Sequence, residues 1–253
     1  ASVFLSASWL VLWFILYKPA RDSRFVNKKE LDFILSDQED AEKIKIPWKK
    51  LMCYRQTWTV ALGKLFADPV WYFYLFWGAK FLNSRFEVEL KGLALPLMII
   101  YAVAYLGGIA GGAASSYFLK RGKSINYARK RTMLGTAILV LPVMSVPFID
   151  SLPVCVCLIA LAAAAHNSWS ANIFTVASDL FPKKMVGSVI GFSTTISSFA
   201  AMGTALVIGY TLNKSGTEGY VVPFVMAAFG YLIGLLVIHL LSPKMKSIAE
   251  EVK

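Results

Sequence analysis

The chain has 253 residues, of which 57% are hydrophobic and only 16% are charged, and its formal net charge is +11. Soluble proteins average about 45–50% apolar and about 25% charged residues, so this composition excludes an ordinary soluble domain and predicts a membrane protein. Positive charge also suits nucleic-acid binding, but no RNA or DNA motif accompanies it, so we expect no nucleic-acid partner.

The first apolar run, 3–17, is shorter than the roughly 20 mostly apolar residues that cross a bilayer. It lacks the basic start of a signal peptide, and Trp9, Trp13 and Tyr17 are typical of the boundary between lipid and water. We therefore expect residues 1–17 to be the end of a truncated transmembrane helix.

Residues 18–56 are the long polar stretch and are expected to form a cytoplasmic loop with short amphipathic helices. Asn27, followed three residues later by Glu30, predicts a capping box at the start of one helix. From Pro47 onward, aromatic and apolar residues alternate with basic ones, which favours a helix on the membrane surface and a solvated linker equally.

Six longer apolar runs follow, and each is long enough to span a bilayer. They cover about 57–82, 94–118, 132–149, 153–177, 186–212 and 221–242, and residues 243–253 form a cytoplasmic tail. The predicted fold class is all-α, a polytopic transmembrane helix bundle. Lys64 and Asp68 lie four residues apart near the inner end of the first run and are expected to pair with each other.

Loops rich in basic residues alternate along the chain with loops that hold few. Lys and Arg number ten in 18–55, six in 119–131, two in 178–187 and three in the tail, whereas the intervening loops hold few. Cytoplasmic loops retain positive charge, so the charge-rich side and the C-terminus are predicted to be cytoplasmic. This pattern indicates a multi-pass protein of the cell membrane, either inner or plasma membrane.

A polar cluster, 166–172, interrupts the run 153–177. Polar side chains at membrane depth are costly, so each is a functional hypothesis by default. The cluster favours a water-filled substrate cavity over hydrogen bonds that only join helices. Trp71 and Tyr74 add an aromatic stripe on which a sugar could stack, although helix packing uses the same residue types.

Two further patterns concern helix packing. Glycines four residues apart predict close helix contacts, at 107/111, 108/112, 187/191 and 230/234. A group of serines and threonines at 193–198 is expected to hydrogen-bond mainly to its own helix backbone, although a ligand would suit it too.

Two stretches carry a family resemblance. The loop that runs from Gly111 through Ser115 and Ser116 to Lys120-Arg121-Gly122-Lys123 resembles the signature loop of the Major Facilitator Superfamily, as repeated in its second half. Residues 165–191, together with Asp68-Pro69-Val70-Trp71, resemble the anion:cation symporter family and most of all its hexuronate (glucuronate/galacturonate) transporters. The signature loop departs from the family pattern, because serines stand where many members have an Asp.

The resemblance implies two six-helix halves around a midplane site, worked by alternating access and driven by a proton gradient. The chain would be the C-terminal six-helix half of a major facilitator fold plus the end of the preceding helix. Its partners would be the lipid bilayer, a small organic anion, protons and a missing N-terminal six-helix half. The resemblance also implies that the coupling carboxylates lie in that half, and no predicted span of this chain places an Asp or Glu at mid-depth.

The resemblance also implies roles for single residues. Substrate contacts are expected from Trp71, Tyr74, His166, Asn167, Ser168, Trp169 and Asn172. Gating contacts at the inner mouth are expected from Lys120, Arg121, Arg129, Lys130, Asp179 and Lys183.

Other functions remain open at this point. The substrate could be another organic anion, an aldonate or aldarate, and seven spans also describe a receptor. A retinal protein needs a Lys in its last span, and 221–242 has none. An enzyme acting through His166 lacks a matched nucleophile, carboxylate or metal spacing, so we expect no enzyme, no catalytic residue, no metal and no cofactor.

Overall fold

The computed structural model describes residues 2–23, 25–36, 47–89 and 91–248. The chain forms two compact units, Ala1–Lys45 and Ile46–Lys253. Part of the predicted polar loop, 37–46, and the last five residues of the predicted tail lie outside the described residues.

The described part of the first unit contains α1 (Ser2–Leu16) and α2 (Lys28–Ser36). At the end of α1 the Trp13 ring stacks on Tyr17, with ring centroids 4.7 Å apart. At the start of α2 the backbone N–H of Glu30 donates to Oδ1 of Asn27 at 2.9 Å. This bond satisfies one of the donors that a helix start leaves unpaired, and it confirms the predicted capping by Asn27.

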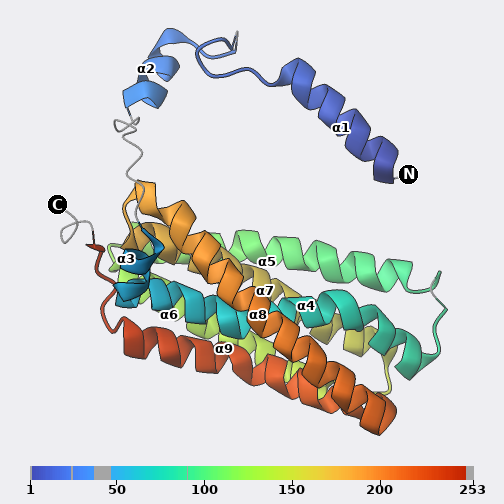
Figure 1. Ribbon diagram of the computed structural model, residues 1–253. Coiled ribbons are helices and arrows are strands. Elements are labelled where there is room, and N and C mark those ends of the chain that lie inside the picture. The colour runs from blue at the N-terminus through green and yellow to red at the C-terminus, as the bar shows by residue number, and fades with distance from the viewer. Residues whose placement is uncertain (1, 24, 37–46, 90, 249–253) are drawn as a thin grey trace. The chain divides into compact units, whose positions relative to one another are not determined.

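The second unit is a helix bundle, and its described elements are all helical (Figure 1). In chain order they are α3 (Trp48–Cys53), α4 (Arg55–Phe86), α5 (Ala94–Lys120), α6 (Ile125–Val140), the 3-10 helix η1 (Leu141–Phe148), α7 (Leu152–Leu180), α8 (Lys183–Ser215), the 3-10 helix η2 (Gly216–Tyr220) and α9 (Val221–Leu241).

Successive helices of the bundle run in opposite directions (Figure 1). The starts of α4, α6 and α8 therefore lie at the same end as the ends of α5, α7 and α9. Helix α3 lies at this end, and so does the basic loop between α5 and α6. The sequence predicted these segments to share the cytoplasmic side.

Local chemistry explains where α6 begins and changes. The hydroxyl of Ser124 accepts a hydrogen bond from the Tyr127 N–H at 3.3 Å, which caps the first turn. Pro142 and Pro147 have no N–H to donate, so the helix continues as the tighter η1. The single run predicted over 132–149 is thus a shorter α-helix followed by a 3-10 segment.

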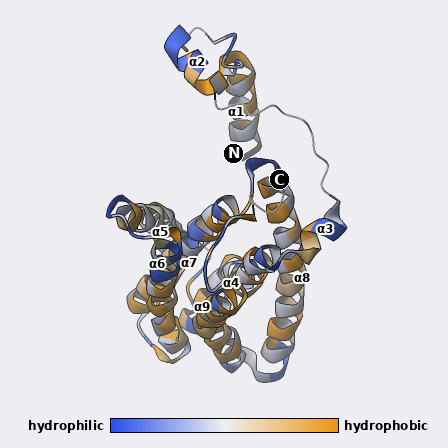
Figure 2. Cartoon of the chain, turned by 90° about the vertical axis from the view of Figure 1, so that its left-hand side faces the viewer, coloured by the Kyte–Doolittle hydropathy of each residue, from blue (hydrophilic) through white to orange (hydrophobic). Residues whose placement is uncertain are grey.

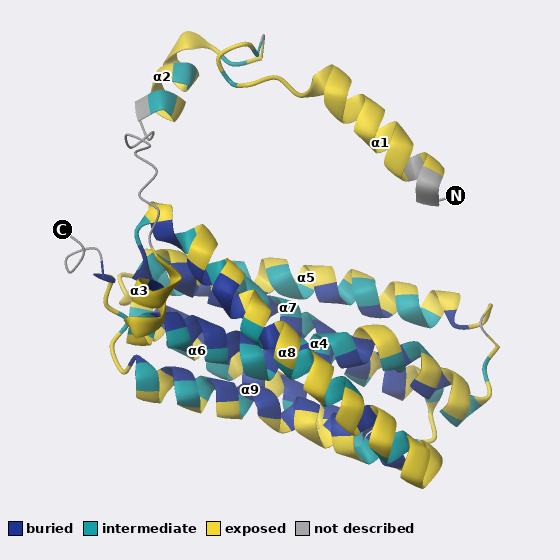
Figure 3. Cartoon of the chain, in the orientation of Figure 1, coloured by how far each residue is buried: buried dark blue, intermediate teal, exposed yellow. Residues whose placement is uncertain are grey.

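Long apolar surfaces are exposed on the bundle. Figure 3 shows exposed residues concentrated on α5 and α8, whereas α7 is largely buried. Figure 2 shows many hydrophobic residues along these helices. Exposed side chains include Tyr105, Leu106, Ile109, Phe199 and Leu206. Such a surface is unsuited to water and fits lipid or the packing of further helices.

Four helical stretches among the described residues are long and apolar enough to cross a membrane: Ala94–Lys120, Ile125–Phe148, Leu152–Leu180 and Lys183–Leu241. The last stretch contains both α8 and α9. The sequence predicted six spans, and the difference is α4, whose charged residues and many aromatic rings lower its hydropathy. Helix α4 nevertheless packs inside the same bundle.

The two predicted glycine pairs 107/111 and 230/234 lie at helix contacts. A Cβ added at Gly107 would collide with the backbone of Ala164, and one added at Gly111 would collide with Ser168. Helices α5 and α7 therefore approach so closely that only glycine fits. The surroundings of Gly112 are open, as are those of 187 and 191.

Candidate functional site

A polar cavity of about 380 Å³ lies between α4, α5, α7 and α8. This is within the range of about 300–1,000 Å³ that is usual for small-molecule sites. Its lining combines one Lys–Asp pair with aromatic rings, hydroxyls, an imidazole and an amide. The lining residues are Lys64, Asp68, Trp71, Tyr72, Tyr101, Ala104, Tyr105, His166, Asn167, Ser170, Phe174 and Thr194.

His166 is held between two aromatic residues. Its imidazole stacks on the indole of Trp71, with ring centroids 5.0 Å apart and an interplanar angle of 11°. Its Nδ1 lies 2.8 Å from the hydroxyl of Tyr231 on α9. These contacts fix the ring plane, so that α4, α7 and α9 are joined at the wall of the cavity.

A charged pair lies on α4 in the same wall. Nζ of Lys64 is 2.9 Å from Oδ2 of Asp68, and the two side chains are only 6% and 17% exposed. The hydroxyl of Ser197 on α8 donates to the same Oδ2 at 2.6 Å. The ammonium of Lys64 also lies 4.8 Å from the ring centroid of Phe174.

The predicted pairing of Lys64 with Asp68 is confirmed, but their predicted depth needs correction. Helix α4 begins at Arg55 and ends at Phe86, so a rise of 1.5 Å per residue places Asp68 about 20 Å along a helix about 48 Å long. Ser197 lies near the middle of α8 as well. The chain therefore holds a carboxylate near the middle of a long helix, where the sequence predicted none.

The structure brings three of the predicted substrate contacts together in the cavity lining: Trp71, His166 and Asn167. Tyr74, Ser168, Trp169 and Asn172 are buried and lie outside that lining. The cavity is therefore formed by one face of the polar turn of α7, and the opposite face packs against neighbouring helices.

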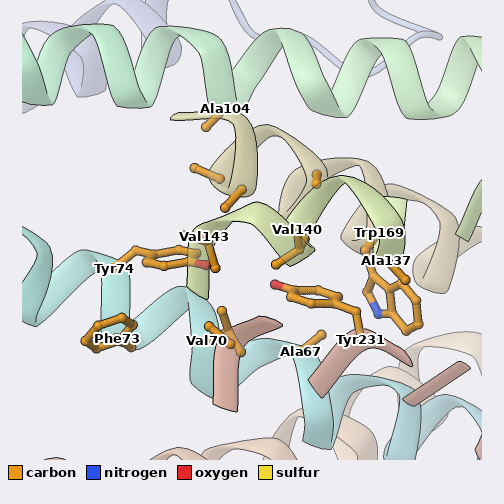
Figure 4. Close-up of a cluster of buried hydrophobic side chains, with 14 of the residues drawn as sticks. Ala67, Val70, Phe73, Tyr74, Ala104, Ala137, Val140, Val143, Trp169 and Tyr231 are labelled. Atoms are coloured by element: carbon orange, nitrogen blue, oxygen red, sulfur yellow. The ribbon is translucent and has the colours of Figure 1, made fainter. Parts of the chain in front are cut away.

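Trp169 and Tyr74 belong to the packed interior (Figure 4). The indole Nε1 of Trp169 donates to the Gly63 carbonyl at 3.2 Å, and its ring meets Tyr231 edge-on at 5.4 Å. The hydroxyl of Tyr74 is buried and has no hydrogen-bond partner among the described residues. Both residues are buried and lie outside the lining of the polar cavity.

Asn172 and Ser168 join α7 to α5. The side-chain amide of Asn172 donates to the carbonyls of Ser168, at 2.9 Å, and Gly111, at 3.3 Å. Its Oδ1 is buried without a partner among the described residues. Because Gly111 carries no side chain, α5 approaches α7 closely enough for this amide to reach its backbone.

Several lining residues were not among the predicted contacts, although the sequence holds a signal for them. Positions 64, 68, 71 and 72 follow the spacing of a single helix face, as do 101, 104 and 105 on α5 and 166, 170 and 174 on α7. Periodicity could have grouped them within each helix. It could not show that the three faces meet.

The basic end of the bundle, where α4 begins, contains a second ionic network. Nε of the buried Arg129 lies 2.8 Å from Oδ2 of Asp179, and its Nη1 donates to the Ser115 hydroxyl at 2.5 Å. Thus Ser115, from the loop that resembles a family signature, contacts this arginine directly. The ion pair links α6 to α7, and the hydrogen bond to Ser115 links α6 to α5.

The other predicted gating residues are spread over the same end. Lys130 donates to the carbonyls of Ser242, at 2.7 Å, and Pro243, at 2.8 Å, beyond the end of α9. The guanidinium of Arg121 lies over the Tyr117 ring at 4.4 Å. Lys120 and Lys183 are exposed. Among the described residues no group of three or more His, Cys, Asp or Glu could hold a metal ion.

Comparison with protein families gives a match to the Major Facilitator Superfamily over residues 1–205. The chain belongs to the Major Facilitator Superfamily. It is therefore a multi-pass membrane protein of a transporter family and not an enzyme, and the helices α4–α9 correspond to a six-helix half of the major facilitator fold.

Several curated relatives of this superfamily member are sugar acid transporters by name. The hexuronate transporter of Escherichia coli (strain K12) is 29% identical over 241 residues, which cover 92% of this chain and 55% of that protein. The probable galactarate/D-glucarate transporter GudP of Bacillus subtilis (strain 168) is 25% identical, with 90% of this chain and 51% of that protein covered. The D-galactonate transporter of Escherichia coli O6:H1 (strain CFT073) is 23% identical, and the match covers 82% of this chain and 51% of that protein. The chain spans about half the length of these relatives.

A solved structure shows the same fold. It is the bacterial homolog of the human lysosomal transporter Spinster, in an inward-facing and occupied conformation, with a TM-score of 0.58 and 18% identity. The match covers 85% of this chain and 54% of that one.

Proposed function

We propose that the protein imports a sugar acid anion, a hexuronate such as glucuronate or galacturonate, by proton symport through alternating access. The observation that carries the proposal is the cavity between α4, α5, α7 and α8, which holds a lysine, an aromatic stack and several polar groups. Sugar acids need these groups, because they present a carboxylate, hydroxyls and an apolar ring face.

The lining residues have chemistry suited to distinct parts of such a substrate. Trp71 offers a ring face for the apolar side of the sugar, and its stack on His166 keeps that face in place. His166, Asn167 and Ser170 offer hydrogen bonds to hydroxyls. We assign Tyr74, Ser168, Trp169 and Asn172 to supporting roles, since each is buried behind the lining.

The basic end of the bundle is assigned to the cytoplasm. The loop between α5 and α6 and the end of α9 carry its positive charge, and cytoplasmic loops of membrane proteins are enriched in Lys and Arg. In this orientation Arg129, Asp179 and Lys130 act as gating contacts at the inner mouth. The C-terminus is then cytoplasmic, in the inner or plasma membrane.

The cavity is proposed to be completed by an N-terminal six-helix half. The relatives are about twice as long as this chain, and α5 and α8 carry broad exposed apolar surfaces. Lipid and helices of a second half together would cover these surfaces.

Uptake of labelled glucuronate and galacturonate by cells that produce the full-length protein tests this function. Uptake above a vector control, abolished by a protonophore, is the expected result. Labelled galactonate and galactarate belong in the same assay, because relatives named for these substrates also match the chain. If none of the four compounds enters above the vector control, or if uptake is insensitive to the protonophore, the proposal fails.

A further inference from the structure

The Lys64–Asp68 pair has a position that helix packing alone does not require. The pair lies near the middle of α4 and in the wall of the polar cavity, not on a lipid-facing or loop surface. Both side chains are nearly buried, and they compensate each other's charge at 2.9 Å. A buried ion pair is weak evidence for stability, since two apolar residues of similar size often serve as well.

A substrate carboxylate in this cavity would compete with Asp68. Lys64 is the cationic residue of the lining, and an ammonium offers three donors, so it attracts a second carboxylate. One lysine between two carboxylates leaves a net charge of one negative in a site of low dielectric. Like charges in such a site favour protonation of one carboxylate.

The contacts of Ser197 allow it to hydrogen-bond to Asp68 in both the ionised and the protonated state. Its hydroxyl now donates to Asp68 at 2.6 Å and also lies 3.0 Å from the carbonyl of Thr194. If Asp68 gains a proton, its O–H donates to the Ser197 oxygen, and the Ser197 hydroxyl donates to Thr194 instead. The hydrogen bond between the two side chains is kept in both states, because a hydroxyl both donates and accepts.

Resting on the function proposed above, we propose that Lys64 receives the carboxylate of the substrate while Asp68 takes up one proton, so that this pair couples anion to proton. Before binding, the pair is neutral. After binding, the neutral Asp68 stays on Ser197, and Lys64 is paired with the substrate. One anion and one proton have entered, and the net charge of the site is unchanged.

Most of the other titratable groups near Asp68 line the same cavity. Tyr72 lies on α4, Tyr101 and Tyr105 on α5, and His166 on α7, while α8 faces the pair with hydroxyls. Tyr231 of α9 lies behind His166 and is bonded to it. Among these groups, Asp68 is in direct contact with Lys64. If Lys64 pairs with a substrate carboxylate instead, Asp68 is the group that loses its counter-ion.

The variant Asp68→Asn separates substrate binding at Lys64 from proton uptake at position 68. It is made in the full-length protein and reconstituted in proteoliposomes. The amide imitates the protonated acid and keeps a hydrogen bond to Ser197. We expect exchange of labelled for unlabelled galacturonate across the membrane to persist, whereas accumulation driven by a proton gradient falls at least about tenfold. Asp150→Asn is the matched control, since that carboxylate pairs with Arg85 on an exposed surface. Accumulation by Asp68→Asn at the wild-type level would overturn the proposal.

Binding measurements test Lys64 separately. Wild-type protein is expected to bind galacturonate at least about tenfold more tightly than its uncharged methyl ester, with galacturonate affinity falling as the pH rises. The double variant Lys64→Gln/Asp68→Asn, which leaves no unpaired charge, should lose this preference and the pH dependence. If the double variant keeps either one, the lysine is not the receptor. Failure of wild-type protein to bind any sugar acid would instead refute the proposed function itself.

Discussion

The imidazole of His166 and the indole of Trp71 lie nearly parallel, 5.0 Å apart, and so join α7 to α4 at the cavity wall. The other side of the histidine is fixed by the hydroxyl of Tyr231. One face of this assembly borders the cavity and the other borders the apolar core. Substitutions on the two faces should therefore have different effects on transport and on stability.

Trp71→Ala should lower galacturonate uptake at least about tenfold, because the sugar loses its stacking surface and His166 loses its support. Trp77→Ala is the matched control on the same helix, since Trp77 lines a different, apolar crevice with Phe76 and Met202. Uptake normalised to the amount of folded protein in the membrane is the measurement. Equal losses in both variants would show that Trp71 has only a packing role.

Tyr231→Phe and Tyr74→Phe each remove one hydroxyl from the core, and only Tyr231→Phe should lower the stability of the protein. The hydroxyl of Tyr231 is bonded to His166, so its loss should destabilise the protein by about 0.5–1.5 kcal/mol. The hydroxyl of Tyr74 is buried without a partner among the described residues, so its removal should be neutral or stabilising. Thermal unfolding in detergent measures both. A loss of uptake in Tyr74→Phe at unchanged stability would instead assign Tyr74 to the substrate.

Gly107→Ala should destabilise the bundle by about 1–3 kcal/mol, because the new methyl group meets the Ala164 backbone and α5 cannot retreat without losing its contact with α7. Gly112→Ala introduces the same methyl group on the same helix into open space and is the control. The melting temperature in detergent should fall for Gly107→Ala alone. Equal melting temperatures would contradict the close approach of these helices.

Asp179→Asn should destabilise the basic end of the bundle, because Arg129 is left buried beside a neutral amide and the Ser115 hydroxyl. Removing one partner of a buried ion pair typically costs about 3–5 kcal/mol, and the partial exposure of Asp179 reduces this value. Lys120→Gln changes an exposed charge nearby and should have little effect on stability. Comparing the two variants by thermal unfolding and by uptake tests the ion pair.

The sequence indicated much of the fold, because apolar runs and loop charges are local properties. Each predicted run falls on a helix, although proline converts the end of one run into a 3-10 segment. The depth of Asp68 could have been predicted, because the run 57–82 already places it near the middle and α4 from Arg55 to Phe86 leaves that relative position unchanged. Terminal residues of helices are difficult to predict without their capping contacts.

The candidate site was predicted in part for a similar reason. Helical spacing places His166, Trp169 and Ser170 on one side of α7. His166 and Ser170 line the cavity, whereas Trp169 bonds to Gly63 in the core. The hydroxyls of Ser193 and Ser198 bond to their own helix as predicted. Ser197 also reaches Asp68 on α4, and only the packing of α8 against α4 determines that contact.

The segment after α9 is attached to the bundle through contacts from α6. Lys130 binds the carbonyls of Ser242 and Pro243, Asn126 accepts from the Met245 N–H at 3.4 Å, and Ile248 is fully buried. Purification tags and fluorescent fusions are commonly joined close to a carboxyl end. Here a junction placed before Ile248 would remove an anchor of the basic end of the bundle, so expression vectors should preserve the chain through that residue and add a spacer beyond it.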